Sequence, residues 1–299
     1  MSDPAKALLA HLQGGVTHTC RAWALSRRDG VVFGFTDHDR ALVFEGITFK
    51  PDTGLSALAV QQTTGLSVDN TEALGALSDA AIREDDIEAG RFDGAEIRAW
   101  LVNWQAPEER LLQFRGTIGE IRRTDGAFEA ELRGLTEALN HPLGRTYQTA
   151  CTAVLGDAAC GFDLDTAGYS ATLEAGVVAE RRVFRFAPAV LEDFELHWFE
   201  RGRLLVRDGP AAGLSGMIKR DWHDAEAGNR VIELWAPLRA PVAAGDMLRL
   251  EAGCDKRMET CRFKFDNLLN FQGFPDIPGD DWTITDPSKA GRLSGGSRR

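Results

Sequence analysis

Four of the five cysteines form two pairs whose spacing suits a shared metal centre. Cys151 and Cys160 have eight residues between them, Cys254 and Cys261 have six, and 94 positions separate Cys160 from Cys254. Thiolates are the ligands of structural zinc and of iron–sulfur clusters. The same four residues could instead form two disulfides or be unrelated core thiols. Because the four cysteines come as two pairs, we expect all four to belong to one site that is formed by four thiolates.

The spacing within each pair favours a cluster over a single zinc ion. Structural zinc usually takes ligands two to four residues apart, because a tight knuckle presents both sulfurs to one small ion. An iron–sulfur cubane is wider and takes one thiolate on each iron, so longer loops can supply its ligands. Lys256, Arg257 and the N–H groups of the Gly253–Cys254 turn could offset the negative charge of a cluster. Zinc and inert core cysteines remain open alternatives.

The start of the chain and its hydropathy bear on the disulfide alternative. Met1-Ser2-Asp3-Pro4 has neither the basic nor the apolar region of a secretion signal, and no apolar run approaches the roughly 20 residues that span a bilayer. We therefore expect assembly in the cytoplasm, where structural disulfides are rare.

The remaining candidate groups are better explained by packing and turns. Cys20 has no partner on its predicted strand, which indicates a small core residue. Asp37-His38-Asp39 are adjacent, so their side chains point in different directions and suit a turn better than a catalytic trio. His197-Trp198 and Trp222-His223 read as aromatic strand positions that pack in a core or an interface.

The sequence offers no enzyme site. It contains no Walker loop, no G-x-G-x-x-G, no nucleophile elbow and no H-E-x-x-H, and nothing near the cysteines would activate one as a nucleophile. The net charge of −11 argues against a protein that grips nucleic acid. An acidic lining would, however, let DNA slide past without adhering.

Alternating apolar residues and many turn signals predict a mainly β fold with few short helices. Asp3 and Pro4 begin a helix that reaches Leu12 and ends at Gly14-Gly15, and Ser78–Gly90 and Leu135–Leu139 read as short helical stretches. The predicted strands of the first half are Thr17–Leu25, Val31–Thr36, Leu42–Phe49 with a turn at Glu45-Gly46, Gly65–Val68, Ala95–Trp104, Glu109–Arg122 and Ala127–Leu132.

Asn140–Gly144 breaks the chain and predicts a domain boundary. We expect an N-terminal β domain over residues 1–144, a C-terminal β domain with the four cysteines over 145–285, and a mobile tail over 286–299. The predicted strands of the second half are Ala171–Ala179, Val183–Phe186, His197–Phe199, Arg203–Arg207, Leu214–Asp221, Val231–Leu234 and Met247–Leu250.

Several motifs resemble those of tail hub proteins from siphophage-like particles and gene transfer agents. In the second half they are Cys151–Asp163, Gly253–Lys256, Cys261, Phe265, Asn267 and Asn270–Gly279; in the first half they are Phe35–Asp39 and Asp86–Ala95. The cysteine spacings are similar to those of the lambda-type tail-tip protein L. That resemblance implies that Cys151, Cys160, Cys254 and Cys261 bind an iron–sulfur cluster, with 4Fe–4S as the expected type. Here the two pairs are farther apart in sequence, with a β module between them.

The resemblance also implies an assembly. Tail hub proteins form a homotrimeric ring at the distal end of a tail tube, and each protomer contributes two tube-type β-barrels. The implied partners are the distal tail protein above the ring, and a tail peptidase and a central fibre protein below it. The implied location is the tail tip of a virion-like particle, with DNA passing through the lumen.

Two other functions compete with a hub. A cluster that cycles between oxidation states would make the chain an electron-transfer protein, but no flavin or nicotinamide motif accompanies the cysteines. A zinc-stapled, sugar-binding tip protein is the second alternative, and exposure of Trp198, Trp222 or Trp235 would favour it.

Overall fold

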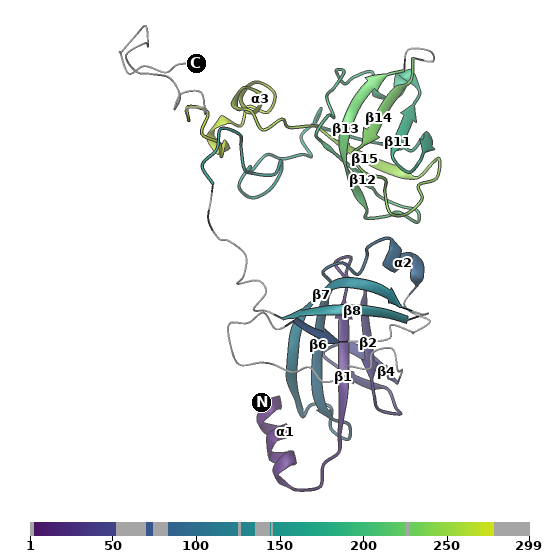
Figure 1. Ribbon diagram of the computed structural model, residues 1–299, viewed down its shortest axis with the longest axis vertical. Coiled ribbons are helices and arrows are strands. Elements are labelled where there is room, and N and C mark those ends of the chain that lie inside the picture. The colour runs from purple at the N-terminus through teal and green to yellow at the C-terminus, as the bar shows by residue number, and fades with distance from the viewer. Residues whose placement is uncertain are drawn as a thin grey trace. The chain divides into compact units, whose positions relative to one another are not determined.

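A computed structural model describes residues 3–51, 70–73, 83–124, 127–134, 144, 146–224 and 228–277. The chain divides into two compact units, Met1–Leu143 and Gly144–Arg299 (Figure 1). Each unit is built on one β-sheet, and the described residues form only three α-helices: α1 (Pro4–Gln13), α2 (Glu84–Glu88) and α3 (Met258–Phe263). The predicted mainly β fold is confirmed, whereas closure of the sheets into tube-type barrels stays a prediction.

The first unit contains an eight-stranded sheet in the order β3-β4-β2-β1-β6-β7-β8-β5. Neighbouring strands are antiparallel except β2 and β4, which pair in parallel at Phe35 and Lys50. The strands are β1 (Thr19–Ser26), β2 (Val32–Thr36), β3 (Leu42–Phe44), β4 (Ile47–Pro51), β5 (Asn70–Ala73), β6 (Glu96–Asn103), β7 (Arg110–Thr124) and β8 (Ala127–Gly134).

Strand β1 is buried on both faces, so its apolar residues run consecutively instead of alternating. One face contributes Trp23 and Leu25 to a core with Phe35, Phe92 and Ile97. The other face contributes Cys20, Ala22 and Ala24 to a second core with Phe49 and Trp100. The α1 helix begins as predicted: Asp3 caps it by accepting the N–H of Ala5 at 3.1 Å, and Pro4 is its first residue.

The second unit contains a seven-stranded antiparallel sheet in the order β10-β11-β14-β13-β12-β15-β9. A short 3₁₀ helix, η2 (Pro188–Leu191), precedes β12, and a second, η3 (Leu268–Asn270), follows α3. The strands are β9 (Ser170–Glu174), β10 (Val177–Ala179), β11 (Val183–Phe186), β12 (Arg203–Val206), β13 (Ser215–His223), β14 (Arg230–Leu234) and β15 (Met247–Glu251).

A buried ion pair fixes the loop that leads into β12. Arg230 on β14 donates to both carboxylate oxygens of Asp221 on β13, at 2.5 and 2.8 Å, and both side chains are almost fully buried. Arg230 also donates to the carbonyl oxygens of Phe194 and Glu195, and Asp221 accepts the N–H of Phe199 at 3.1 Å. The pair therefore holds Phe194–Phe199 against the sheet, because each remaining polar atom finds a backbone partner.

Two strand predictions are wrong. His197–Phe199 is a turn, and His197 has a positive φ, in the left-handed region that a strand excludes. Ala171–Ala179 is two strands, because the chain breaks at Ala175-Gly176 and places β9 and β10 at opposite edges of the sheet. The sequence reading also missed helix α3. The predictions for Gly65–Val68, Leu135–Leu139 and the tail 286–299 lie outside the described residues.

None of the helices in the described ranges is both long and apolar enough to cross a membrane.

Candidate metal centre

The four paired cysteines line one small cavity of about 20 Å³ in the second unit. Cys151 and Cys160 lie on the loop before β9, Cys254 follows β15, and Cys261 is on helix α3. Apolar, amide and cationic residues form the rest of the wall, namely Ala153, Leu155, Phe265, Phe271, Asn267, Asn270, Lys256 and Arg257. The fold thus gathers all four predicted ligands, although 94 positions separate the two pairs.

Asp157 shapes the loop that carries the first pair. Its carboxylate accepts the N–H groups of Val154 at 2.8 Å, Ala159 at 3.0 Å and Cys160 at 2.7 Å. Its own carbonyl oxygen accepts the N–H of Gly161, whose φ is positive. The N–H bonds of Cys160, Val154 and Ala159, together with the charge of Lys256, hold the pKa of Asp157 below its ordinary value despite some desolvation. The carboxylate is therefore charged and organises the loop as a multiple Asx turn.

The second pair is positioned by the end of β15 and by helix α3. Gly253 lies so close to the turn before β12 that a Cβ there would overlap the carbonyl oxygen of Glu200. Its N–H donates to the carbonyl oxygen of Trp198 at 2.9 Å. Only glycine allows this approach, and the contact fixes the direction in which the chain leaves the sheet toward Cys254.

Hydrogen bonds tie the two cysteine segments together. The N–H of Cys151 donates to the carbonyl oxygen of Lys256 at 2.9 Å, and the Lys256 ammonium donates to the carbonyl oxygen of Ala153 at 2.5 Å. The Asn267 amide donates to the carbonyl oxygen of Cys160 at 2.7 Å. These three hydrogen bonds hold the first loop against the second segment.

Three N–H groups point at cysteine sulfurs. The backbone N–H of Gln272 lies 3.4 Å from Sγ of Cys151, and the Asn267 amide nitrogen lies 3.5 Å from Sγ of Cys160. The backbone N–H of Lys256 donates to the sulfur of Cys254. Donors of this kind stabilise thiolates and metal-bound sulfur, and they lower the energy of a negatively charged centre.

The thiols of the second pair resist ionisation in the absence of a metal. Burial raises the pKa of Cys254, although the N–H and the charge of Lys256 oppose the rise. Burial, followed by the charge that Cys254, Cys151 and Cys160 would carry as thiolates, raises the pKa of Cys261 to about 11. The Cys261 S–H donates to the carbonyl oxygen of Asn267 at 3.2 Å. A metal bound here must displace these protons, as thiolate ligation requires.

The donor set, four thiols with N–H groups directed at three of the sulfurs, has the chemistry of a thiolate-bound metal centre. Four thiolates would have to converge at about 2.3 Å on one zinc ion. Within the described ranges, which include all four cysteines, no three His, Cys, Asp or Glu side chains are grouped closely enough to hold one metal ion. A cluster spreads its four ligands over four irons, and the N–H groups directed at sulfur suit its negative charge.

The other candidate residues have structural roles. Cys20 is in the core of the first unit, where its S–H donates to the carbonyl oxygen of Val102. Asp37 accepts the N–H of Arg21 at 2.6 Å, and His38 accepts the N–H of Arg40 at 3.0 Å, so this trio makes turn contacts. Trp198 donates to the carbonyl oxygen of Gly168, and Trp222 stacks with Arg220.

The motifs include two residues that organise the centre, Asp157 and Asn267, but the sequence did not predict their roles. Asp157 stands three positions before Cys160, and an Asp that accepts N–H groups two and three residues ahead is a recognisable turn signal. Asn267 carries no such signal, because its contacts with Cys160 span 107 positions.

Comparison with known proteins agrees with the motifs. A family model described as a baseplate hub protein, N-terminal attachment domain, matches residues 5–163. A second model, described as phage conserved hypothetical protein BR0599, matches residues 197–281. No curated protein matches the chain.

Among solved structures, the chain is similar to a chain of the virion of a native gene transfer agent (GTA) particle. The two share 56% sequence identity with a TM-score of 0.87, and the match covers 97% of this chain and 98% of that chain. The first family model alone matches more than half of the residues, and the structural match extends the likeness through both units. The chain belongs to the baseplate hub protein family.

Proposed function

We propose that this chain is a structural, non-catalytic hub at the tail tip of a gene transfer agent or related phage-like particle. The observation that carries the proposal is the match over nearly the whole length of the chain to a component of a gene transfer agent virion. Because the match covers 97% of this chain, it includes both β units. We infer assembly in the bacterial cytoplasm and a final location in the particle.

The hub forms a homotrimer in which two β units per protomer provide six similar modules around a channel. The eight- and seven-stranded sheets supply the two modules that this symmetry needs. The ring connects the tail tube and the distal tail protein to a tail peptidase and a central fibre protein. The net charge of −11 suits a lumen through which DNA passes without specific binding.

Cys151, Cys160, Cys254 and Cys261 hold an iron–sulfur cluster, of the 4Fe–4S type, with zinc as the less favoured alternative. The bound cluster supplies iron–thiolate bonds that link the two segments covalently. The chain's own residues prepare the site: Asp157 presents Cys160, and Asn267 and Gln272 direct N–H groups at sulfur. Lys256 adds a positive charge beside Cys254 and Asp157.

Bound to all four cysteines, a cluster would cross-link residues at the start of the second unit to residues that follow the last strand of that unit. The cross-link would close a loop of about 100 residues whose closure entropy opposes folding. A group that binds only the folded state adds its binding free energy to stability. The centre therefore stabilises the second unit at the point where its chain leaves the sheet.

The hub function is tested in the organism that makes the particle. Deletion of the coding gene should give particles without a complete tail tip, visible by electron microscopy, and should abolish DNA transfer. Expression of the chain from a plasmid should restore both. Complete tail tips and normal transfer in the deletion strain would show that the chain is not the hub.

The cluster is tested on protein purified without oxygen. Iron and sulfide at cluster stoichiometry in the wild-type chain, and their loss in Cys254→Ser, would support the assignment. Cys20→Ala is the matched control, because Cys20 lies in the other unit and should leave the iron content unchanged. One zinc per chain would show that the four cysteines bind zinc instead of a cluster. If the wild-type protein contains neither metal, the proposed cross-link between the two cysteine segments is wrong, and the hub proposal is unaffected.

One observation favours a second function, contact with carbohydrate. Trp235 follows β14 with 65% of its surface exposed, and the Lys219 ammonium lies 5.7 Å from the centre of its ring. An exposed indole beside a hydrogen-bond donor is a common platform for a sugar ring. Trp235→Ala should then reduce binding to host-cell polysaccharide, whereas Trp222→Ala, whose ring is half-buried, should not. Equal binding by all three proteins would exclude this function.

A further inference from the structure

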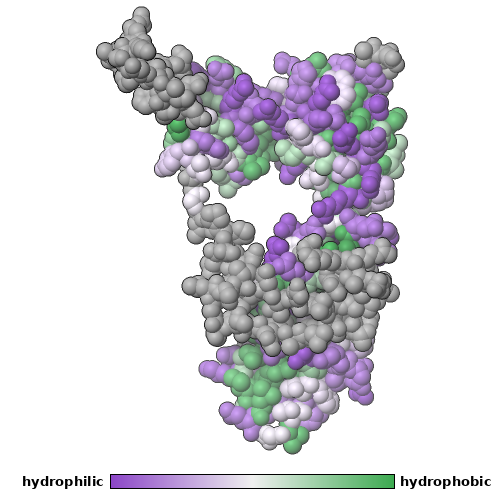
Figure 2. Space-filling model, viewed as in Figure 1, coloured by the Kyte–Doolittle hydropathy of each residue, from purple (hydrophilic) through white to green (hydrophobic). Residues whose placement is uncertain are grey.

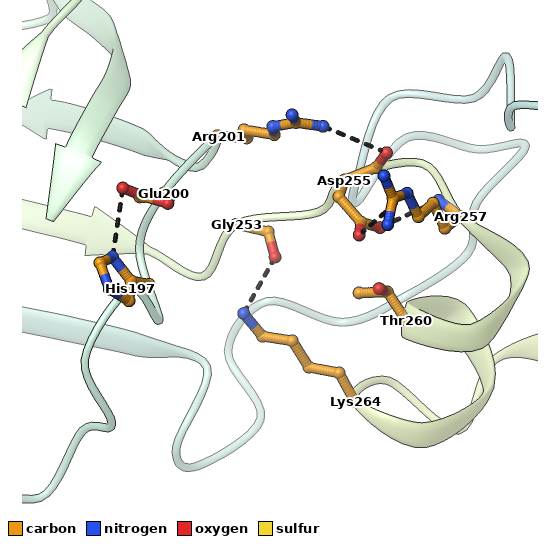
Figure 3. Close-up of a pocket in the computed structure, with 8 residues that line it drawn as sticks. All are labelled: His197, Glu200, Arg201, Gly253, Asp255, Arg257, Thr260 and Lys264. Atoms are coloured by element: carbon orange, nitrogen blue, oxygen red, sulfur yellow. Dashed lines mark hydrogen bonds and ion pairs between the residues drawn. The ribbon is translucent and has the colours of Figure 1, made fainter.

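A polar cleft of about 300 Å³ lies beside the four-cysteine centre, between the turn before β12 and helix α3 (Figure 3). The turn supplies His197, Glu200 and Arg201, and the segment after β15 supplies Gly253, Asp255 and Arg257. Thr260 and Lys264 close it from the helix side. Figure 2 shows hydrophilic residues interspersed with apolar ones on the visible face of the second unit.

The cleft carries a net positive charge although the whole chain carries −11. Three cationic side chains line it, Arg201, Arg257 and Lys264, against two carboxylates, Glu200 and Asp255, which leaves +1 with His197 neutral. Both carboxylates already have local partners. Glu200 lies 3.2 Å from Nδ1 of His197, and Asp255 accepts the N–H of Arg257 at 2.9 Å.

Two of the cations lack a carboxylate partner in the part of the chain that the structure describes. Lys264 donates to the carbonyl oxygens of Trp198 and Gly253, at 2.8 and 3.0 Å, and lies 4.0 Å from the centre of the Trp198 ring. The guanidinium of Arg201 donates to the carbonyl oxygen of Asp255 at 3.5 Å, its one hydrogen bond among the described residues. Two carbonyl oxygens and the Trp198 ring compensate the half-buried ammonium of Lys264 with partial charges only. An anion in the cleft would add the full opposite charge that both cations lack.

The backbone around the cleft is strained. His197, Arg201 and Lys256 all have positive φ values, in the left-handed region that L-residues other than glycine rarely adopt. Strain of this kind persists where the surrounding structure imposes it, and it is common at ligand sites. Here the buried Asp221–Arg230 pair holds the turn at His197, and the approach of Gly253 to Glu200 holds Arg201 beside the cleft.

We propose that this cleft binds a single carboxylate, the side chain of an aspartate or glutamate presented by another protein of the particle. The net charge of +1 matches one carboxylate, and a guanidinium, an ammonium and the Thr260 hydroxyl line the space. A nucleic acid would bring further phosphates against an acidic chain, which disfavours it. The site does not depend on which metal, if any, the four cysteines bind.

The test is an NMR titration of the full-length, isotope-labelled chain with two small probes. N-acetyl-glutamate amide carries the carboxylate, and N-acetyl-glutamine amide is its neutral isostere. The first should shift the amide resonances of Gly253 and Thr260 and saturate, and the second should not. Arg201→Gln and Arg257→Gln should each weaken the apparent affinity about tenfold, because each removes a charge-assisted contact. Both side chains are exposed, so the fold should tolerate their replacement.

Arg262→Gln is the matched control, because Arg262 is an exposed residue on the same helix but does not line the cleft. Its affinity should equal that of the wild type. The proposal would be overturned by equal shifts from the neutral probe, by shifts that never saturate, or by equal weakening in Arg262→Gln. Tighter binding of inorganic phosphate or of a single-stranded oligonucleotide would assign the cleft to phosphate instead.

Discussion

Asn267 holds Cys160 by two contacts from a single side-chain nitrogen. Its Nδ2 donates to the carbonyl oxygen of Cys160 at 2.7 Å and lies 3.5 Å from the sulfur of the same residue. The carbonyl oxygen of Asn267 accepts the S–H of Cys261 at 3.2 Å, and its backbone N–H donates to the carbonyl oxygen of Cys261. One residue thus contacts a cysteine of each pair.

Replacement of Asn267 with Asp should weaken metal retention at the four-cysteine centre. The change keeps the side chain's size but removes both N–H donors and places a negative charge beside sulfur. Loss of such an outer contact typically costs about 10–100-fold in metal affinity. The measurement is iron retained against a competing chelator. Asn229→Ala, in the turn before β14 and not in the wall of the cysteine cavity, should retain iron like the wild type; an equal loss there would refute a specific role for Asn267.

Replacement of Asp157 with Ala should loosen the first cysteine loop. Three backbone N–H groups, those of Val154, Ala159 and Cys160, lose their acceptor at once. We expect faster amide hydrogen exchange at Ala159 and Cys160 and slower cluster assembly, because the loop no longer presents Cys160 in one geometry.

Asp163→Ala is the control for the loop. Asp163 makes a similar turn by accepting the N–H of Asp165 at 2.9 Å, but it contacts no cysteine. Exchange at Cys160 should not change in that variant. If Asp157→Ala assembles a cluster as fast as the wild type, the Asp157 turn is not needed to position Cys160 for cluster binding.

The structural features that the sequence predicted correctly are those that neighbouring residues determine. The capped helix at Asp3-Pro4, the hairpins and the paired cysteines are all signalled by neighbouring residues. The wrong strand at His197–Phe199 has a non-local cause, because the Asp221–Arg230 pair holds that segment as a turn from two other strands. The role of Asn267 has the same origin, since its partner Cys160 lies 107 positions away.

Replacement of Gly253 with Ala should destabilise the second unit. The added Cβ would overlap the carbonyl oxygen of Glu200 and lie 3.0 Å from the nitrogen of Gly202, and both are backbone atoms that cannot rotate away. Overpacking of this kind costs about 1–3 kcal/mol, and the displaced segment carries Cys254. Urea unfolding should show a lower midpoint, together with a lower iron content.

Gly144→Ala is the control for Gly253→Ala. A Cβ at Gly144 meets no atom of the described residues within 4 Å, so the midpoint should stay within error of the wild type. A wild-type midpoint in Gly253→Ala would mean that the strand end can move away from Glu200 without cost.

The free energy of unfolding should fall in alkaline solution because of Cys20. Burial raises the pKa of this thiol from 9.0 to about 11, with the Thr36 hydroxyl opposing and the charge of Asp37 adding to the rise. The unfolded thiol ionises near pH 9 while the folded one keeps its proton. The stabilisation is therefore fully present below about pH 9 and is lost as the pH rises through 11.

Between pH 7.5 and 10.5 the wild type should lose about 2 kcal/mol more than Cys20→Ala, from the pKa difference and the linkage relation. The measurement is urea unfolding followed by circular dichroism at both pH values. The two proteins share the same lysine, tyrosine and metal-site groups, so the contribution of these groups to the pH dependence of stability cancels in the comparison. An equal loss in both proteins would show that the Cys20 thiol ionises as readily in the folded core as in the unfolded chain.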